Sequence, residues 1–266
     1  MKTLGIIGGI GPESTIDYYR LTIATYREQK RDGSYPTIII NSIDLKRVRD
    51  LVEAGALKEL AEHLVSELHK LARAGAHLGL LAANTPHIVF DDVQQQSPIP
   101  LISIVQATCD SAKALGFNCL GLFGTSFTMQ GRFYPDVFSR QGVTLVVPDQ
   151  EEQACIHDKY MNELVNGMFL PETRNQLLTI VQSLKDRHQI DGLILGGTEL
   201  PLILRDADAS IPFLDTARIR AGRSRQTVVL ASSVRIPVDH FAQCPITRHT
   251  CICVLASRFH RGIRIH

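Results

Sequence analysis

The sequence predicts an α/β protein of two similar domains with mainly parallel sheets, related by a pseudo-twofold axis, with a ligand cleft between them. Three observations favour this fold class. Short apolar runs alternate with helical patterns, segments of the first half recur in the second, and hydrophobic residues make up 44% of the 266 residues. This apolar content supports a large core and excludes intrinsic disorder. The sequence has no run of 18 apolar residues, so we expect no membrane partner.

Strands are expected where apolar runs are uninterrupted, because a parallel strand covered by helices on both faces is apolar throughout. These runs are 3–8, 37–41, 78–82, 101–104, 120–124, 144–147, 192–195 and 212–214. Between them, apolar residues recur at helical spacing, most clearly at Leu57, Leu60, Ala61, Leu64, Leu68 and Leu71. His63 and His69 lie off this stripe, so we expect both to be solvated.

The internal repeat is carried by three segments that recur in the same order, at offsets of 116, 114 and 112 residues: 4–8 with 120–124, 79–85 with 193–199, and 99–103 with 211–215. Matches in this order indicate two halves of the same architecture. The third pair lies where the chain is expected to cross from one half to the other and later to cross back. We therefore divide the chain into three parts: a first domain of 1–97 plus 210–230, a second domain of 98–209, and an atypical basic tail of 231–266.

The C-terminal residues differ in composition from the rest. Residues 221–266 hold seven Arg, one Asp and no Lys or Glu, a charge of +6, which leaves +1 − 6 = −5 for residues 1–220. These arginines are scattered without interleaved aromatic residues, so we expect no nucleic-acid partner. Three of the six cysteines also lie here, without the spacing of a typical zinc half-site, so we expect no metal. The tail is expected to have no role in the cleft.

Small and hydroxyl residues follow the expected strands of both halves. In a parallel sheet, ligands bind beyond the carboxyl ends of the strands. The helices that follow would point backbone N–H groups at this edge, which favours a negatively charged ligand. The pattern therefore predicts one cleft for a small anionic ligand that carries a carboxylate group.

A glycine-rich segment, residues 9–14 (GIGPES), partly matches a dinucleotide-binding fingerprint, with Asp44 as a possible ribose ligand. However, Ser14 stands where a third glycine would allow the helix to pack closely on the strand. Pro12 suits the first position of a helix, so the segment is better explained as a tight strand-to-helix turn. We expect no cofactor.

Several of these segments resemble the aspartate/glutamate racemase superfamily, and specifically its aspartate racemase branch. The matching pieces span about residues 1–220: 8–15 (GGIGPEST), 83–87 (ANTPH), Gly124-Thr125 with Thr128-Met129, 197–200 (GTEL) and 213–216 (FLDT). The resemblance implies two α/β domains with the site between them, cofactor-independent chemistry and a homodimer. It also implies that the anionic ligand is an amino acid or a dicarboxylate. Six cysteines without paired spacing fit a reducing compartment, so a cytoplasmic location is expected.

The family's reaction inverts an α-carbon, which requires an acid/base group on each face of that carbon. The resemblance implies that two cysteines supply these groups, one from each half. In this sequence Ala83 occupies the first cysteine position and Gly197 the second. Neither side chain can transfer a proton, so the two-cysteine mechanism cannot operate.

Other side chains remain as candidates near the strand ends. His87 and Glu199 match positions close to the family's catalytic residues and form a candidate acid/base pair, because burial can raise a carboxyl pKa into a useful range. The alternative is that both are supporting residues left in place after the thiols were lost. The expected substrate-binding residues are Ile10, Gly11, Asn84, Thr85, Thr125, Thr128, Thr198 and Lys159.

A basic contact for the ligand has two possible sources. Lys159 lies on the same helix face as Cys155, where related proteins often supply such a contact. Lys46, Arg47 and Arg49 follow the second strand and offer another carboxylate clamp, although at least two of the three are expected to be solvated.

Two functions remain open from the sequence. One is an amino-acid racemase-family enzyme whose α-carbon proton transfer is altered or lost. The other is a non-catalytic ligand-binding pseudoenzyme of the same fold. A third explanation is that these two positions were altered by engineering, in which case restoring both cysteines would restore racemisation.

Overall fold

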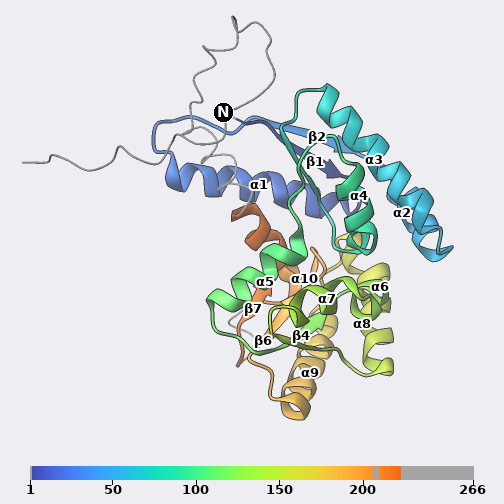
Figure 1. Cartoon of the computed structure of the whole chain (residues 1–266). Helices are drawn as coiled ribbons and strands as arrows, with labels where there is room; N and C mark the ends of the chain where they lie inside the picture. Colours follow the sequence, from blue (N-terminus) through green and yellow to red (C-terminus); the bar gives the residue numbers. More distant parts are fainter. Residues whose placement is uncertain (1, 206–209, 223–266) are drawn as a thin grey trace, which may run out of the picture. The chain divides into compact units, whose positions relative to one another are not determined.

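The computed structural model describes residues 2–205 and 210–222, which form two parallel sheets with flanking helices (Figure 1). The expectations for the tail, 231–266, and for the last part of the first domain lie outside the described residues.

The first sheet consists of β1 (Leu4–Gly8), β2 (Ile38–Ser42) and β3 (Leu78–Leu81). Their order is β2-β1-β3 and both pairings are parallel. Next to β3, Leu101 forms an isolated parallel bridge with Gly79. The predicted strand at 101–104 is therefore wrong beyond its first residue, because Ser103 already caps a helix that begins at Ile104.

The second sheet consists of β4 (Cys119–Phe123), β5 (Thr144–Val146), β6 (Gly192–Leu195) and β7 (Phe213–Asp215). Their order is β5-β4-β6-β7 and all pairings are parallel. This repeats the order of the first sheet, with the bridge at Leu101 in the place that β7 takes in the second. The prediction of two halves with parallel sheets is confirmed.

Helices connect the strands of both halves. The first half has α1 (Pro12–Gln29), α2 (Leu45–Glu53), α3 (Leu57–Arg73), the 3-10 turn η1 (Thr85–Val89) and α4 (Phe90–Gln96). After these come α5 (Ile104–Ala114), α6 (Ser126–Gln130), α7 (Phe133–Ser139), α8 (Gln150–Asn162), η2 (Leu164–Asn166), α9 (Pro171–His188) and α10 (Leu200–Ile203). A last helical segment covers residues 216–222.

Each face of the first sheet has its own core, because successive side chains of a strand point to opposite faces. Ile7 and Leu81 pack into a cluster with α2, α3 and α4, whereas Leu4 and Ile6 pack with Tyr18 of α1. Ala217, from the helical segment that follows β7, belongs to the second of these clusters. Figure 1 shows this segment, in orange, beside α1.

The second sheet is also covered on both faces. Leu193 and Leu195 pack with residues of α8 and α9, whereas Leu120 and Ile194 pack with residues of α5 and α7. This two-sided cover explains the unbroken apolar runs from which the strands were predicted.

The buried face of helix α3 includes two polar residues, His63 and Glu67, beside its apolar stripe. His63 is buried, with Nδ1 3.8 Å from Glu67 Oε1, and Glu67 in turn accepts hydrogen bonds from Asn41 and Lys70. The expectation that His63 is solvated is therefore wrong, because α3 packs against β1, β2, α2 and α4 at once.

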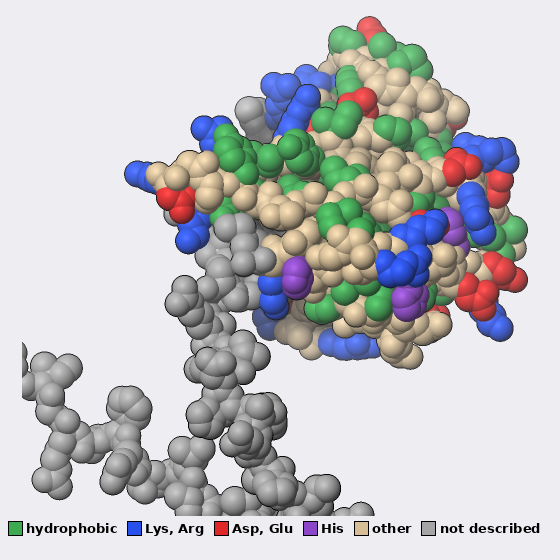
Figure 2. All heavy atoms as spheres, turned by 90° about the horizontal axis from the view of Figure 1, so that it is seen from above, with side chains coloured by type: hydrophobic (Ala, Val, Ile, Leu, Met, Phe, Trp, Pro, Cys, Tyr) green, Lys and Arg blue, Asp and Glu red, His purple; other side chains and the backbone are tan. Residues whose placement is uncertain are grey.

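The surface carries a mixture of side-chain types. On the face in Figure 2, acidic and basic side chains are interspersed with hydrophobic ones and no unbroken field of one charge forms. Within the described part of the chain, every helix is too short or too polar to span a bilayer.

Candidate functional site

A small pocket of about 80 Å³ lies at the carboxyl ends of the strands, where the sequence predicts the cleft. Both halves contribute to it, through the residues that follow β1, β3, β4 and β6. It brings together nine of the sequence-predicted site residues: Ile10, Gly11, Ala83, Asn84, Thr85, Thr125, Gly197, Thr198 and Glu199.

Two of the expected ligand contacts lie outside this pocket. The Thr128 side chain is fully buried behind Thr125, with the two hydroxyl oxygens 3.2 Å apart. Lys159 donates to Glu163 Oε1 at 2.7 Å, an ion pair that the i,i+4 spacing of α8 favours. The structure therefore gives Lys159 a partner on its own helix and does not place it against the pocket.

His87 is also outside this pocket. Its ring is buried, stacks on Phe90 at 4.8 Å, and accepts a hydrogen bond at Nε2 from the N–H of Ile104 at 3.2 Å. Burial, together with the nearby Arg220 guanidinium, holds the pKa of His87 well below its usual value. A neutral ring that satisfies the first amide of α5 has a structural role, and the structure does not set His87 opposite Glu199.

The two cysteine positions do line the pocket. Ala83 presents a buried methyl group from the end of β3. Gly197 lies after β6, directly against Tyr160 of α8. A Cβ atom at residue 197 would come within 3.0 Å of the Tyr160 hydroxyl oxygen and still closer to the ring carbons. Tyr160 therefore fills the volume that a side chain at residue 197 would need.

Glu199 is the most buried carboxyl group of the pocket, with 2% of its surface exposed. Its Oε2 atom accepts hydrogen bonds from the Tyr160 hydroxyl and from the Thr198 hydroxyl, the latter at 3.0 Å. Burial raises the pKa of Glu199 in spite of these two bonds. Burial and the neighbouring Glu199 raise the pKa of Tyr160 well above its usual value.

Gly11 makes room for this carboxyl group. Its φ of 103° is unfavourable for residues with a side chain, and a Cβ atom there would lie 2.6 Å from Glu199 Oε1. The glycine of the first strand-to-helix turn thus allows a carboxylate of the second half to approach the backbone of the first.

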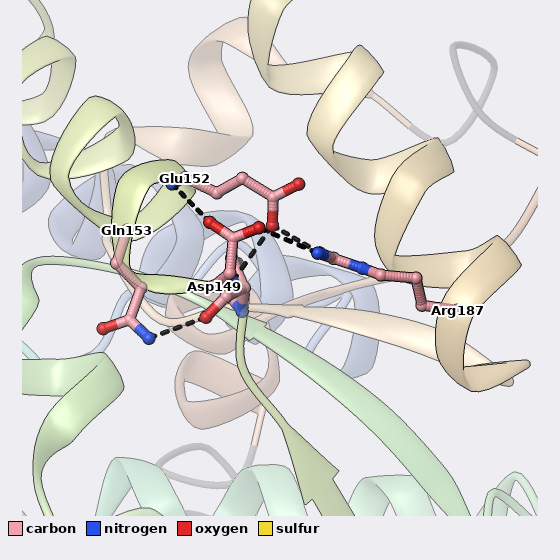
Figure 3. A network of polar contacts seen from close by, with 5 residues as sticks. Asp149, Glu152, Gln153 and Arg187 are labelled. Atoms are coloured by element: carbon pink, nitrogen blue, oxygen red, sulfur yellow. Dashed lines mark hydrogen bonds and ion pairs between the residues drawn. The ribbon is translucent and has the colours of Figure 1, made fainter.

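The orientation of α8 decides which of its side chains reach the pocket. Asp149 and Glu152 form a capping box at its start, and Arg187 of α9 binds both carboxylates (Figure 3). Further along, His157 accepts the N–H of Ser126 at Nδ1, at 3.2 Å. This anchoring directs His157 and Tyr160 into the pocket, and the sequence alone identified neither.

Asn84 is held by residues that are distant in sequence. Its Oδ1 accepts from the Tyr134 hydroxyl at 2.7 Å and its Nδ2 donates to Thr216 Oγ1 at 3.3 Å. The Thr85 and Thr125 hydroxyl oxygens lie 3.2 Å apart and join the two halves at the pocket. The polar groups are therefore fixed in place.

The outer wall of the pocket combines one cation with apolar side chains. Of the three basic residues after β2, Arg49 lines the pocket, with Nε 3.8 Å from Glu53 Oε1. The apolar part of this wall consists of Leu45, Val48, Val52, Phe127, Met161 and Val165. Within 2–205 and 210–222, no three His, Cys, Asp or Glu side chains are grouped so that they could hold a metal ion.

Two parallel α/β halves therefore share one pocket at their strand ends. The chain belongs to the Asp/Glu/Hydantoin racemase family, whose sequence model matches residues 7–223.

Individual relatives agree with this assignment. The crystal structure of an aspartate racemase homologue from Pyrococcus horikoshii OT3 is 36% identical, with a TM-score of 0.74 over 88% of this chain and 100% of that one. The aspartate racemase of Picrophilus torridus has the same fold, with a TM-score of 0.67 at 22% identity over 86% and 95% of the two chains. The broad specificity amino-acid racemase RacX of Bacillus subtilis is 23% identical over 235 residues, 86% of this chain and 100% of RacX.

Proposed function

We propose that the protein binds a small amino acid or a related carboxylic acid in the pocket and does not racemise it by the two-cysteine mechanism. The observation that carries this proposal is the pair Ala83 and Gly197, which line the pocket from the two halves without a thiol. The names of the relatives, a broad specificity amino-acid racemase and an aspartate racemase homologue, support an amino acid as the ligand.

The polar groups of the pocket suit a carboxylate. The hydroxyls of Thr85 and Thr125 and the amide of Asn84 are hydrogen-bonding groups at the strand ends. Hydrogen bonds to a charged group are stronger than neutral ones, so a few fixed donors suffice to orient a small anion. Because these groups come from both halves, a bound ligand would be held by both.

Arg49 supports a second anionic contact. Among the described lining residues it is the side chain that carries a permanent positive charge, and 41% of it is exposed at the pocket wall. Apart from Glu53, which pairs with Arg49, the rest of that wall is apolar, so a ligand with a small apolar side chain also fits. The contribution of Arg49 decides between these two kinds of ligand.

Isothermal titration calorimetry with the L- and D-forms of aspartate, glutamate, alanine and methionine tests the proposal. We expect at least one to bind, and Thr85→Val to weaken that binding about tenfold, the equivalent of one hydrogen bond to a charged group. Thr144→Val is the matched control, because Thr144 is exposed on β5 and outside the pocket. Binding of none of the eight compounds, or equal weakening by the two variants, would contradict the proposal.

Arg49→Met then separates the ligand classes. If the ligand is a dicarboxylate, this change weakens the binding of aspartate or glutamate and leaves the binding of alanine unchanged. The pseudoenzyme remains the second candidate function, favoured by the loss of both thiols, and turnover of a bound ligand would exclude it.

A further inference from the structure

We propose that the Tyr160 hydroxyl, backed by Glu199, takes the place of the second thiol and moves protons at one face only of the bound ligand's α-carbon. The protein would then exchange the α-hydrogen of one enantiomer with solvent and keep its configuration. This inference rests on the proposed function, because it needs an amino acid in the pocket.

The position of the hydroxyl group carries the first part of the argument. Any side chain at residue 197 would start within 3.0 Å of the Tyr160 oxygen and closer still to the ring carbons. Tyr160 lines the pocket and only 6% of its surface is exposed. The Tyr160 ring therefore fills the space where the second thiol's side chain would begin, and it brings a hydroxyl group that carries a proton to this place.

Glu199 gives this oxygen a proton partner. The Tyr160 hydroxyl donates a hydrogen bond to Glu199 Oε2, so a direct path for proton transfer joins the two groups. The raised pKa of Glu199 makes its carboxylate a stronger base than an exposed one. Thr198 binds the same oxygen and fixes the carboxyl group in this orientation.

The proton-transfer step balances without a co-reactant. The Tyr160 oxygen takes the α-proton while its own proton moves to Glu199. The electron pair of the broken C–H bond passes into the ligand's carboxyl group as an enediolate. While the enediolate persists, the proton on the Tyr160 oxygen trades places with the one on Glu199, and both exchange with water. The reverse transfer from Tyr160 then returns a solvent-derived proton to the same face of the carbon, and Glu199 gives its proton back to Tyr160.

Among the residues that the structure describes, the wall contributed by the first half has no equivalent of the Tyr160–Glu199 pair. Ala83 supplies a methyl group where the first thiol is expected, and Ile10 also lines the pocket. Among the described lining residues of the first half, Glu53 carries the one carboxyl group. It is 56% exposed and pairs with Arg49 at the rim. Proton delivery from this side is therefore missing, and the reaction stops short of inversion.

The test is incubation of the full-length protein in D₂O with each amino acid that binds by calorimetry. Loss of the α-proton signal is followed by NMR, and configuration by chiral chromatography. We expect exchange of one enantiomer with retention, and a loss of about 100-fold or more in the exchange rate in Tyr160→Phe and Glu199→Gln. Both variants should still bind the ligand, which a merely structural role of these residues would not predict.

Tyr26→Phe is the matched control. It also removes a buried phenol hydroxyl, one that lies 3.2 Å from Ser34 Oγ and outside the pocket, so it should leave the exchange rate unchanged. Inversion of configuration, exchange of both enantiomers, or unchanged exchange in Tyr160→Phe would overturn the inference. Binding without any exchange would overturn it while the proposed function stands, whereas an absence of binding would overturn the proposed function itself.

Discussion

The ring of Tyr160 and the missing side chain of Gly197 are complementary: the large residue occupies the space that the small one leaves. The two positions are 37 residues apart in sequence and come from α8 and the turn after β6. The size of the side chain at one of these positions therefore limits the size of the side chain that fits at the other.

Gly197→Cys alone should destabilise the protein. Its Cβ would overlap the Tyr160 ring, and overpacking of a buried site typically costs ~1–3 kcal/mol. Urea unfolding measures this cost. Gly222→Cys is the matched control, since a Cβ there meets no atom of the described residues within 4 Å. Equal stability of the two variants would mean that the Tyr160 ring can move aside at no cost in free energy, and would contradict the prediction.

Restoring both cysteines should not restore racemisation while Tyr160 is present. We expect Ala83→Cys with Gly197→Cys to remain inactive, and the addition of Tyr160→Ala to produce measurable racemisation of a bound amino acid. The physical reason is that the ring occupies the position from which the second thiol would act. Chiral chromatography provides the assay, and activity in the two-cysteine variant would refute the prediction.

Glu199→Gln should change how stability depends on pH. Because burial raises the pKa of Glu199 above 4.5, the folded state holds this proton more tightly than the unfolded state. The wild type therefore loses stability as pH rises from 4.5 to the raised pKa. Glutamine does not titrate, so the variant has no such loss. Urea unfolding from about pH 4 to about pH 8 should show the variant gaining on the wild type across this window. A stability difference that stays constant with pH would contradict the assignment.

Tyr134→Phe should weaken ligand binding and lower the stability of the protein, although Tyr134 does not line the pocket. It removes the hydroxyl that binds Asn84 Oδ1, and an unsatisfied buried acceptor costs ~1–3 kcal/mol. We expect lower stability in urea and weaker ligand binding in calorimetry, since Asn84 loses its fixed orientation. Phenylalanine keeps the ring packing of this fully buried residue, so a result equal to the wild type would show that Asn84 is held by Thr216 alone.

The fold could be predicted from the sequence because its strands are apolar on both faces and occur twice. Local patterns failed where packing decides the outcome. Leu101 forms a single bridge because the next helix begins only three residues later. His63 is buried because α3 contacts neighbours on more than one side.

Of the candidate site, the residues that follow strands could be predicted to lie together, and they line one pocket, since strand ends meet at one edge. The contribution of α8 was missed because successive residues of a helix differ in direction by about 100°. Lys159 therefore points to Glu163 while Tyr160, its neighbour, points to Glu199. A glycine at residue 197 could have indicated that another side chain packs against its backbone. No local sequence pattern, however, identifies Tyr160 as that side chain.

The helical segment at 216–222 has a consequence for the synthesis of the protein. Arg220 donates to the carbonyl of Leu81 and to the Tyr18 hydroxyl, and Ala217 packs with Leu4. Part of one face of the sheet made first is thus covered by residues that are synthesised long after the sheet itself. The nascent N-terminal half must leave that part of the face uncovered, and prone to aggregation, until 217 − 81 = 136 more residues have followed its last strand, which ends at Leu81.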